Sequence, residues 1–174
     1  RHPSRAVRKI GKIISGRPTG AEIPRLQGGF FDQFLFPEEN FMKTLCIRLR
    51  RGDDLLGAIQ ALAEKEHLEA AVVLSAVGCV SAARVRDAGG INLREIREPC
   101  EIVSLTGTVS RARCHLHIAL SKEDLSTVGG HLVTGCIVNT TCELVLGVLD
   151  GWRFGTQDDP QTGYDEIVFE RVEA

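Results

Sequence analysis

Residues 105–143 constrain the fold more than any other part of the chain, because strand patterning, glycine pairs and histidines gather there. This stretch holds three of the five histidines and three of the six cysteines. From His115 to Leu120 polar and apolar residues alternate, which predicts a strand. Leu116 and every second residue after it would then face a core, while the imidazoles of His115 and His117 point to the opposite face.

Two imidazoles spaced in this way on one strand face can share a metal ion. His131 follows the Gly129-Gly130 pair, where backbone freedom permits a close approach, and can bring a third nitrogen to the same point. Three histidines without a fourth protein ligand match an open zinc site, which keeps a position for water. The same pair is also compatible with polar filling of a half-exposed face or with a hydrogen-bonded pair, and these interpretations stay open.

The composition is that of one ordinary globular domain. The chain has 174 residues, of which 43% are hydrophobic and 25% charged, enough to bury a sizeable core without disulfides or structural metal. No apolar run reaches the roughly 18 residues of a spanning helix, so we expect no membrane association. The six cysteines form no CxxC pair, and several lie in apolar runs as buried thiols do. We therefore expect a reducing, cytoplasmic setting.

Charge is distributed unevenly along the chain. Residues 1–20 carry six basic and no acidic side chains, whereas the rest carry 15 basic and 23 acidic ones. Four prolines and weak periodicity over residues 1–41 predict an irregular basic extension, followed by a folded domain over residues 42–174. Attraction to nucleic-acid phosphates would come from the extension. The residues assigned to DNA contact are Arg5, Arg8, Lys9, Lys12 and Arg17.

Hydrophobic patterning becomes regular after the extension. Residues 45–50 alternate as a half-buried strand with a basic outer face. Asp53 or Asp54 then caps a helix that ends near His67, and this helix is expected to cover a sheet. Residues 70–78 form a continuous β-branched apolar run, which is typical of a strand buried on both faces.

The remaining sequence predicts an antiparallel meander, because the connections between its strands are too short for parallel crossovers. The predicted strands cover residues 82–87, 91–96, 102–110, 115–121, 136–149 and 166–172, with a short element over 131–134 and loops over 122–127 and 155–163. Glu143 interrupts an otherwise apolar strand, so we expect it to be paired, hydrogen-bonded or at an interface. It is a candidate general base, or a partner that orients a metal ligand.

Five motifs follow one another in the second half of the chain: LTGTVS, HLHIALS, GGHLVTGCIV, TTCELVL and TGYDEIVF. In this order they resemble the plants and prokaryotes conserved (PPC) domain family, in its bacterial single-domain branch, and the resemblance covers about residues 42–172. It implies an α+β fold, with a mixed, mainly antiparallel curved sheet packed with a few helices. It also implies a homotrimer whose sheet faces lie near the subunit contacts.

The resemblance extends to possible ligands. Some prokaryotic members of the family hold a metal ion through the histidines of the HxH and GGH motifs, which are His115, His117 and His131 here; their ligand type favours zinc. Plant members carry AT-hooks before this domain, and these bind the minor groove of A·T-rich DNA. The segment Ser15-Gly16-Arg17-Pro18 matches the Arg-Gly-Arg-Pro centre of a hook in part, since a serine replaces the first arginine.

Three functions follow from these features. The first is a DNA-binding or regulatory protein of otherwise unassigned biochemical role, with the basic extension on phosphates and a trimer that adds avidity. The second is a metal-dependent enzyme or small-ligand-binding protein with a three-histidine zinc site. The third is a trimeric scaffold in which the histidines and Glu143 form a polar network. We favour the first, assign no catalytic residue and expect a non-enzymatic role, with the others as alternatives.

Overall fold

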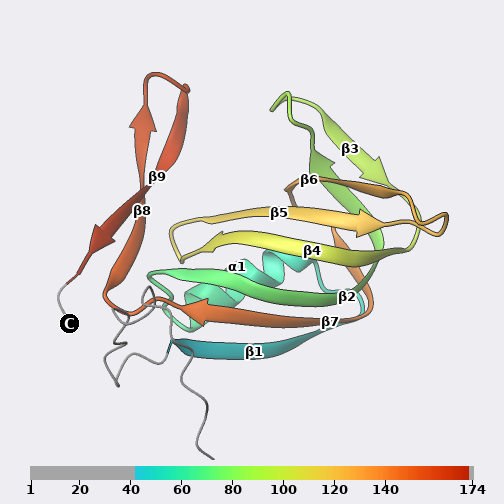
Figure 1. Cartoon of the computed structure of the whole chain (residues 1–174), viewed down its shortest axis with the longest axis horizontal. Helices are drawn as coiled ribbons and strands as arrows, with labels where there is room; N and C mark the ends of the chain where they lie inside the picture. The colour runs from blue at the N-terminus through green and yellow to red at the C-terminus, as the bar shows by residue number, and fades with distance from the viewer. Residues whose placement is uncertain (1–41, 173–174) are drawn as a thin grey trace, which may run out of the picture. The chain divides into compact units, whose positions relative to one another are not determined.

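The computed structural model describes residues 42–172, which form nine strands and one helix (Figure 1). In chain order they are β1 (Lys43–Arg50), α1 (Leu55–Lys65), β2 (Ala71–Arg86), β3 (Leu93–Ile96), β4 (Cys100–Val109), β5 (Cys114–Ser121), β6 (Thr127–Leu132), β7 (Ile137–Val148), β8 (Trp152–Asp159) and β9 (Tyr164–Arg171). Every strand pair is antiparallel, as the short connections predicted.

Seven strands form the main sheet, in the order β1-β7-β2-β4-β5-β6 with β3 paired to β2. The long strand β2 pairs with β4 along its first part and with β6 at Val85 and Arg86. The path β2-β4-β5-β6 therefore returns to β2, and the sheet curls until it closes on itself (Figure 1). This closure brings the end of β2 beside β6, although about 45 residues of chain separate them.

Helix α1 covers one face of the sheet and supplies part of the core. Its N-cap is Asp54, whose side chain accepts a hydrogen bond from the Gly57 N–H at 2.8 Å. Leu55, Ile59 and Ala63 are fully buried, and their helical spacing gives α1 a single apolar stripe. The sheet contributes fully or almost fully buried residues to the same core: Val80, Val109, Leu116, Leu120, Val138, Leu144 and Leu146.

The prediction that residues 70–78 are buried on both faces was wrong for the single chain. Ala71 and Ala76 of this run are buried on the core side, whereas Leu74 and Val77 are 47% and 57% exposed. Val103 on the neighbouring strand β4 is 58% exposed. The continuous apolar run therefore reflects an apolar outer face of the sheet, and nothing in residues 42–172 covers it.

Three predicted elements also differ from the structure. The short element predicted over residues 131–134 is the end of β6, which begins at Thr127 and ends at Leu132. The strand predicted over residues 82–87 is the continuation of β2, which runs without interruption to Arg86. Most of the loop predicted over residues 155–163 belongs to β8, which pairs with β9 in a separate two-stranded ribbon. Polar residues and a glycine in β8 suggested a loop. A two-stranded ribbon needs no apolar face along its whole length, because both faces of its outer part lie in water.

The α+β prediction holds in its main feature, a mostly antiparallel sheet packed with helix. Instead of a few helices, residues 42–172 contain α1 alone, with 11 residues. No helix in this part of the chain is long and apolar enough to cross a membrane. The predicted basic extension over residues 1–41 lies outside the described residues, as do its assigned DNA contacts and the partial AT-hook.

Candidate metal centre

Three histidines converge on one face of the sheet, as their motifs predicted. His115 and His117 lie on β5, and His131 on β6 is the register partner of His117. The His115 ring centroid is 5.2 Å from that of His117 and 5.0 Å from that of His131, and the last two are 5.4 Å apart. One nitrogen from each ring lies within 4.8 Å of the others. Tetrahedral zinc with bonds of about 2.0 Å needs nitrogens about 3.3 Å apart, so binding would draw the three rings closer together.

The alternation along β5 holds two of these rings in place. Leu116 and Leu120 are fully buried and Ile118 is 3% exposed, so every second residue of the strand is anchored in the core. Neighbouring side chains of a strand point to opposite faces, which directs His115 and His117 away from the core. The rigid packing beneath them limits how far the two imidazoles can separate.

Two glycines allow β6 to bring the third histidine close. A Cβ atom on Gly129 would clash with the backbone carbonyl of Ile118 on β5, and one on Gly130 would crowd the carbonyl of Arg86 on β2. Strand β6 is thus held between two neighbouring backbones at a distance that only glycine permits. The next residue, His131, is delivered to the point where β5, β6 and β2 meet. The pair lies inside a strand rather than in a turn.

The surroundings of His115 and His131 favour neutral imidazoles. Burial lowers the pKa of His131 to about 4, and the positive charge of Arg86 adds to this effect. Burial also lowers the pKa of His115, with Arg113 as the next cause. A neutral ring offers a free nitrogen to a metal ion, whereas a protonated ring does not. Both rings are therefore in the ligand form at neutral pH.

One atom of the cluster lacks a partner. His131 Nδ1 is buried and has no hydrogen bond within the part of the chain that the structure describes. Buried polar atoms are almost always satisfied, so an orphan atom marks a place for an ion or an ordered water. The grouped donors are three imidazoles, which suit zinc and similar transition metals, whereas calcium and magnesium prefer oxygen ligands. The residues present therefore fit a metal ion.

A cavity of about 370 Å³ adjoins the histidines. His115 and His131 line it together with Arg86 at the end of β2 and Arg113 just before β5. Its other walls come from the β2–β3 turn, the start of β5 and the start of β9: Ala88, Gly90, Cys114, Tyr164, Asp165 and Glu166. The Arg113 guanidinium donates to the backbone carbonyl of Asp165 and lies 3.7 Å from its carboxylate. This contact fastens the ribbon to the rim of the cavity.

Glu143, in contrast, is not part of this site. It lies on β7 opposite Arg48 of β1 and Val77 of β2, and β2 and β4 separate its strand from β5. Its side chain is exposed on the outer face, between the buried Cys142 and Leu144. Glu143 has no ion pair or side-chain hydrogen bond within residues 42–172, so of its three expected settings only a place at an interface stays open, and the geometry of the single chain does not let it orient a histidine ligand.

The sequence did not single out the charged residues that do surround the histidines. They are Arg86, Arg113, Asp165 and Glu166, all of which line the cavity. Glu166 is close enough to His115 to favour its protonated form, against the larger effect of burial on the pKa of His115. Among the sequence motifs, only TGYDEIVF pointed to this lining, because it contains Tyr164 and both acids. The pairing of β2 with β6 that places Arg86 is not readable from local patterning.

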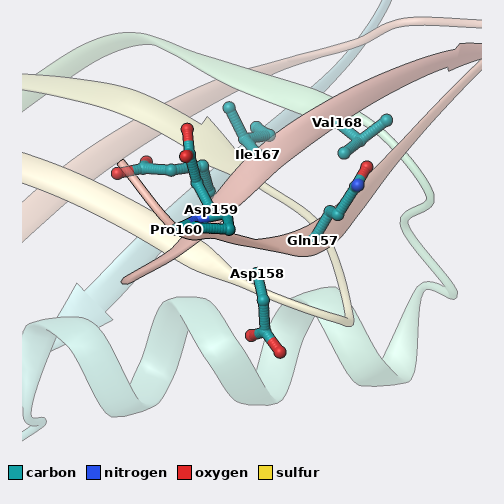
Figure 2. Close-up of a pocket in the computed structure, with 7 residues that line it drawn as sticks. Gln157, Asp158, Asp159, Pro160, Ile167 and Val168 are labelled. Atoms are coloured by element: carbon teal, nitrogen blue, oxygen red, sulfur yellow. The ribbon is translucent and has the colours of Figure 1, made fainter. Parts of the chain in front are cut away.

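A second hollow of about 290 Å³ lies on the β8–β9 ribbon (Figure 2). It is lined by Gln157, Asp158, Asp159, Pro160, Glu166, Ile167 and Val168. In Figure 2, Asp158 points away from Ile167 and Val168. This lining contains no imidazole, thiol or basic side chain, so it offers neither the nitrogen and sulfur donors typical of a zinc site nor a positive charge for an anion. The histidine cavity is the stronger candidate site.

The model of the Plants and Prokaryotes Conserved (PCC) domain matches residues 36–150 of this chain. The chain belongs to this family. PCC is the PPC domain that the sequence motifs resemble, and the matched range contains all three histidines of the cluster. The β8–β9 ribbon, which supplies Tyr164 and Glu166 to the cavity, follows the matched range.

Curated relatives of this PCC domain are much longer proteins. Two proteins named bifunctional protein GlmU, from Synechococcus sp. strains JA-3-3Ab and JA-2-3B'a(2-13), are 40% and 38% identical to it over 131 residues. The aligned region covers 75% of this chain and 21% of each relative. The chain thus spans about a fifth of the length of the curated relatives it matches.

Solved structures share the fold over nearly their whole length. A hypothetical protein from Salmonella cholerae-suis is 30% identical with a TM-score of 0.72, covering 76% of this chain and 97% of that protein. A metal-containing protein from Archaeoglobus fulgidus is 32% identical with a TM-score of 0.59, over 75% and 94%. A protein from Ralstonia eutropha JMP134 described as a candidate DNA-binding protein is 25% identical with a TM-score of 0.62, over 71% and 89%.

Proposed function

We propose that this PCC domain is a metal-binding protein in which His115, His117 and His131 hold one zinc ion. The convergence of three ring nitrogens within 4.8 Å is the observation that carries the proposal. A zinc ion on three histidines keeps a fourth position for water or a substrate oxygen and makes bound water more acidic. The similar protein from Archaeoglobus fulgidus, described as metal-containing, supports the assignment.

The test is the metal content of the full chain purified without chelator. We expect about one zinc per chain in the natural protein and less than a tenth of that in His131→Gln. His67→Asn is the matched control, because His67 lies outside the cluster and has a φ of 51°, which asparagine tolerates. Loss of zinc from both variants, or none in the natural protein even after zinc is added and excess removed, would refute the proposal.

DNA binding through the basic extension is a second candidate function. It is supported by the description of the Ralstonia eutropha protein and by the exposed cations Arg48, Arg50 and Arg51 at and just after the end of β1. In this proposal the extension contributes the phosphate contacts of Arg5, Arg8, Lys9, Lys12 and Arg17. Duplex affinity would then fall steeply with salt, and the slope would shrink when these five residues are replaced by glutamine. Equal salt slopes for both proteins would exclude this role.

We also propose that the domain is a homotrimer, as its family resemblance implies. The exposed apolar residues Leu74, Val77 and Val103 support an interface on the outer face of the sheet. Light scattering after size exclusion would give the mass of three chains, and Val77→Asp would shift the protein to monomer. Ile91→Asp is the control, since Ile91 is 83% exposed in the β2–β3 turn. A natural protein that elutes as a monomer would contradict the proposal.

A further inference from the structure

The end of β2 presents an arginine to the histidine cavity without an acidic partner. Arg86 is the register partner of His131 and lines the same cavity. Its Nε is buried and has no hydrogen-bond acceptor within residues 42–172, and no carboxylate of this range lies within 4.0 Å of its guanidinium nitrogens. A partly buried guanidinium left unpaired is costly, so its donors are available for a ligand.

The other charged residues in and beside the cavity do not neutralise the positive charge of Arg86. Arg113, the second cation, is already occupied by Asp165. Asp87, next to Arg86 in sequence, directs one carboxylate oxygen to Asn92 and lies 3.6 Å from Arg94. Glu166 is the remaining acid of the lining. It offsets one positive charge, but a zinc ion on the histidines would add two, so the occupied site would be positive.

We propose that this cavity binds a small oxyanion, a carboxylate or a phosphate group, held by Arg86 beside the metal position. Guanidinium and oxyanion match in geometry, since two parallel N–H groups meet two oxygens. A volume of about 370 Å³ accommodates a small molecule that carries such a group. The inference rests on the proposed metal centre for its chemistry, because the anion would lie next to the open position of the ion. A small oxyanion is thus the class of ligand expected beside the metal position.

The ribbon gives the cavity a polar far wall. Tyr164 lies over the β2–β3 turn, where a Cβ atom built on Gly90 would be 3.5 Å from the tyrosine hydroxyl. The hydroxyl and Arg86 therefore flank the cavity from two different elements, β9 and β2. A hydroxyl donates to an oxyanion or to the body of a polar molecule that carries one. The β8–β9 ribbon thus supplies part of the binding surface.

The experiment follows the arginine side chains directly by NMR, in the full chain labelled with ¹⁵N-arginine. Acetate and sulfate, a tetrahedral substitute for a phosphate monoester, are titrated into metal-free and zinc-loaded protein. We expect a saturable shift of the Arg86 Nε–H signal in both forms. The dissociation constant followed on Arg113 should rise about tenfold or more in Arg86→Gln, as for loss of a charge-assisted hydrogen bond. Arg97→Gln, which removes an exposed charge between β3 and β4, should leave it unchanged.

The outcomes separate this inference from the proposed metal centre. Zinc bound with no saturable shift of Arg86 for either anion would overturn the anion site and leave the metal centre standing. Arg86-dependent binding by a protein that takes up no zinc would support the anion site and refute the metal centre. Equal affinities in Arg86→Gln and the natural protein would overturn the role of Arg86. If Arg86→Gln does not fold, the presence or absence of a saturable shift of the Arg86 Nε–H signal in the natural protein still tests the proposal.

Discussion

Arg86 on β2 lies directly opposite His131 on β6. This pair belongs to the ladder that closes the sheet on itself, so one contact completes both the fold and the candidate site. The closure places a guanidinium beside an imidazole, and its charge helps to lower the pKa of His131. A change that loosens this corner of the sheet should therefore affect stability and metal binding together.

Gly130→Ala tests this coupling. The added Cβ would crowd the backbone carbonyl of Arg86, so β6 must move away from β2. We expect a loss of about 1–3 kcal/mol in the free energy of unfolding, as for an overpacked core site. Zinc content should fall as well, because His131 moves with the strand. Gly155→Ala is the control, since nothing lies within 4 Å of its Cβ position. Equal stability and zinc content in the two variants, measured by urea denaturation and elemental analysis, would contradict this account.

Asp54→Ala should destabilise the domain by about 1–3 kcal/mol, because two hydrogen bonds depend on this carboxylate. One oxygen accepts from Gly57 at the start of α1 at 2.8 Å, and the other accepts from the Gly135 N–H at 2.6 Å. Asp54→Asn should lose less, since its amide oxygen can still cap the helix. The midpoint and slope of urea unfolding measure both effects.

Asp53→Ala provides the comparison for this prediction. Within residues 42–172 the Asp53 carboxylate accepts a hydrogen bond only from the exposed Arg50 N–H, so removing this side chain should cost no more than about 0.5 kcal/mol. A larger effect at Asp53 than at Asp54 would mean that the capping assignment is incorrect.

Acid should destabilise the metal-free protein through His131. Its folded-state pKa of about 4 lies below the ordinary value of 6.5, so the unfolded chain binds a proton more readily between these values. The stability that this neutral ring contributes is complete above pH 6.5 and declines as the pH falls towards 4. Unfolding curves in the presence of chelator should show a steeper loss over this range for the natural protein than for His131→Gln. Parallel curves would rule out a neutral, half-buried His131.

The cysteines should differ widely in their reaction with an alkylating agent. Burial raises the pKa of Cys136 to about 12 and that of Cys142 to about 11, and both thiols are fully buried. Cys46 is exposed on β1. Because the thiolate is the reactive form, iodoacetamide at pH 8 should modify Cys46 in the folded protein and reach the other two only after unfolding. Mass spectrometry of digested protein measures each site, and early labelling of Cys136 would contradict the described core.

Much of the fold could be predicted from local pattern. Three features follow from spacing and short connections, which are local properties. They are an aspartate cap at Asp53 or Asp54, the buried alternation of Leu116, Ile118 and Leu120, and the antiparallel connectivity. The strand β8 was missed because its polar residues carry no apolar face. The double burial expected for residues 70–78 was wrong because an apolar run shows that both faces are hydrophobic and does not show what covers each of them.

The sequence by itself determined the donors of the site, since two histidines on one strand face and a third after a glycine pair are local features. Only the tertiary structure decided their surroundings. The closure of β2 onto β6 brings Arg86 to the cluster, and the packing of the ribbon adds Tyr164 and Glu166. The same structure moves Glu143 away, because its strand lies across β2 and β4 from the histidines. Contacts between distant segments depend on the register and curvature of the whole sheet, which no local pattern encodes.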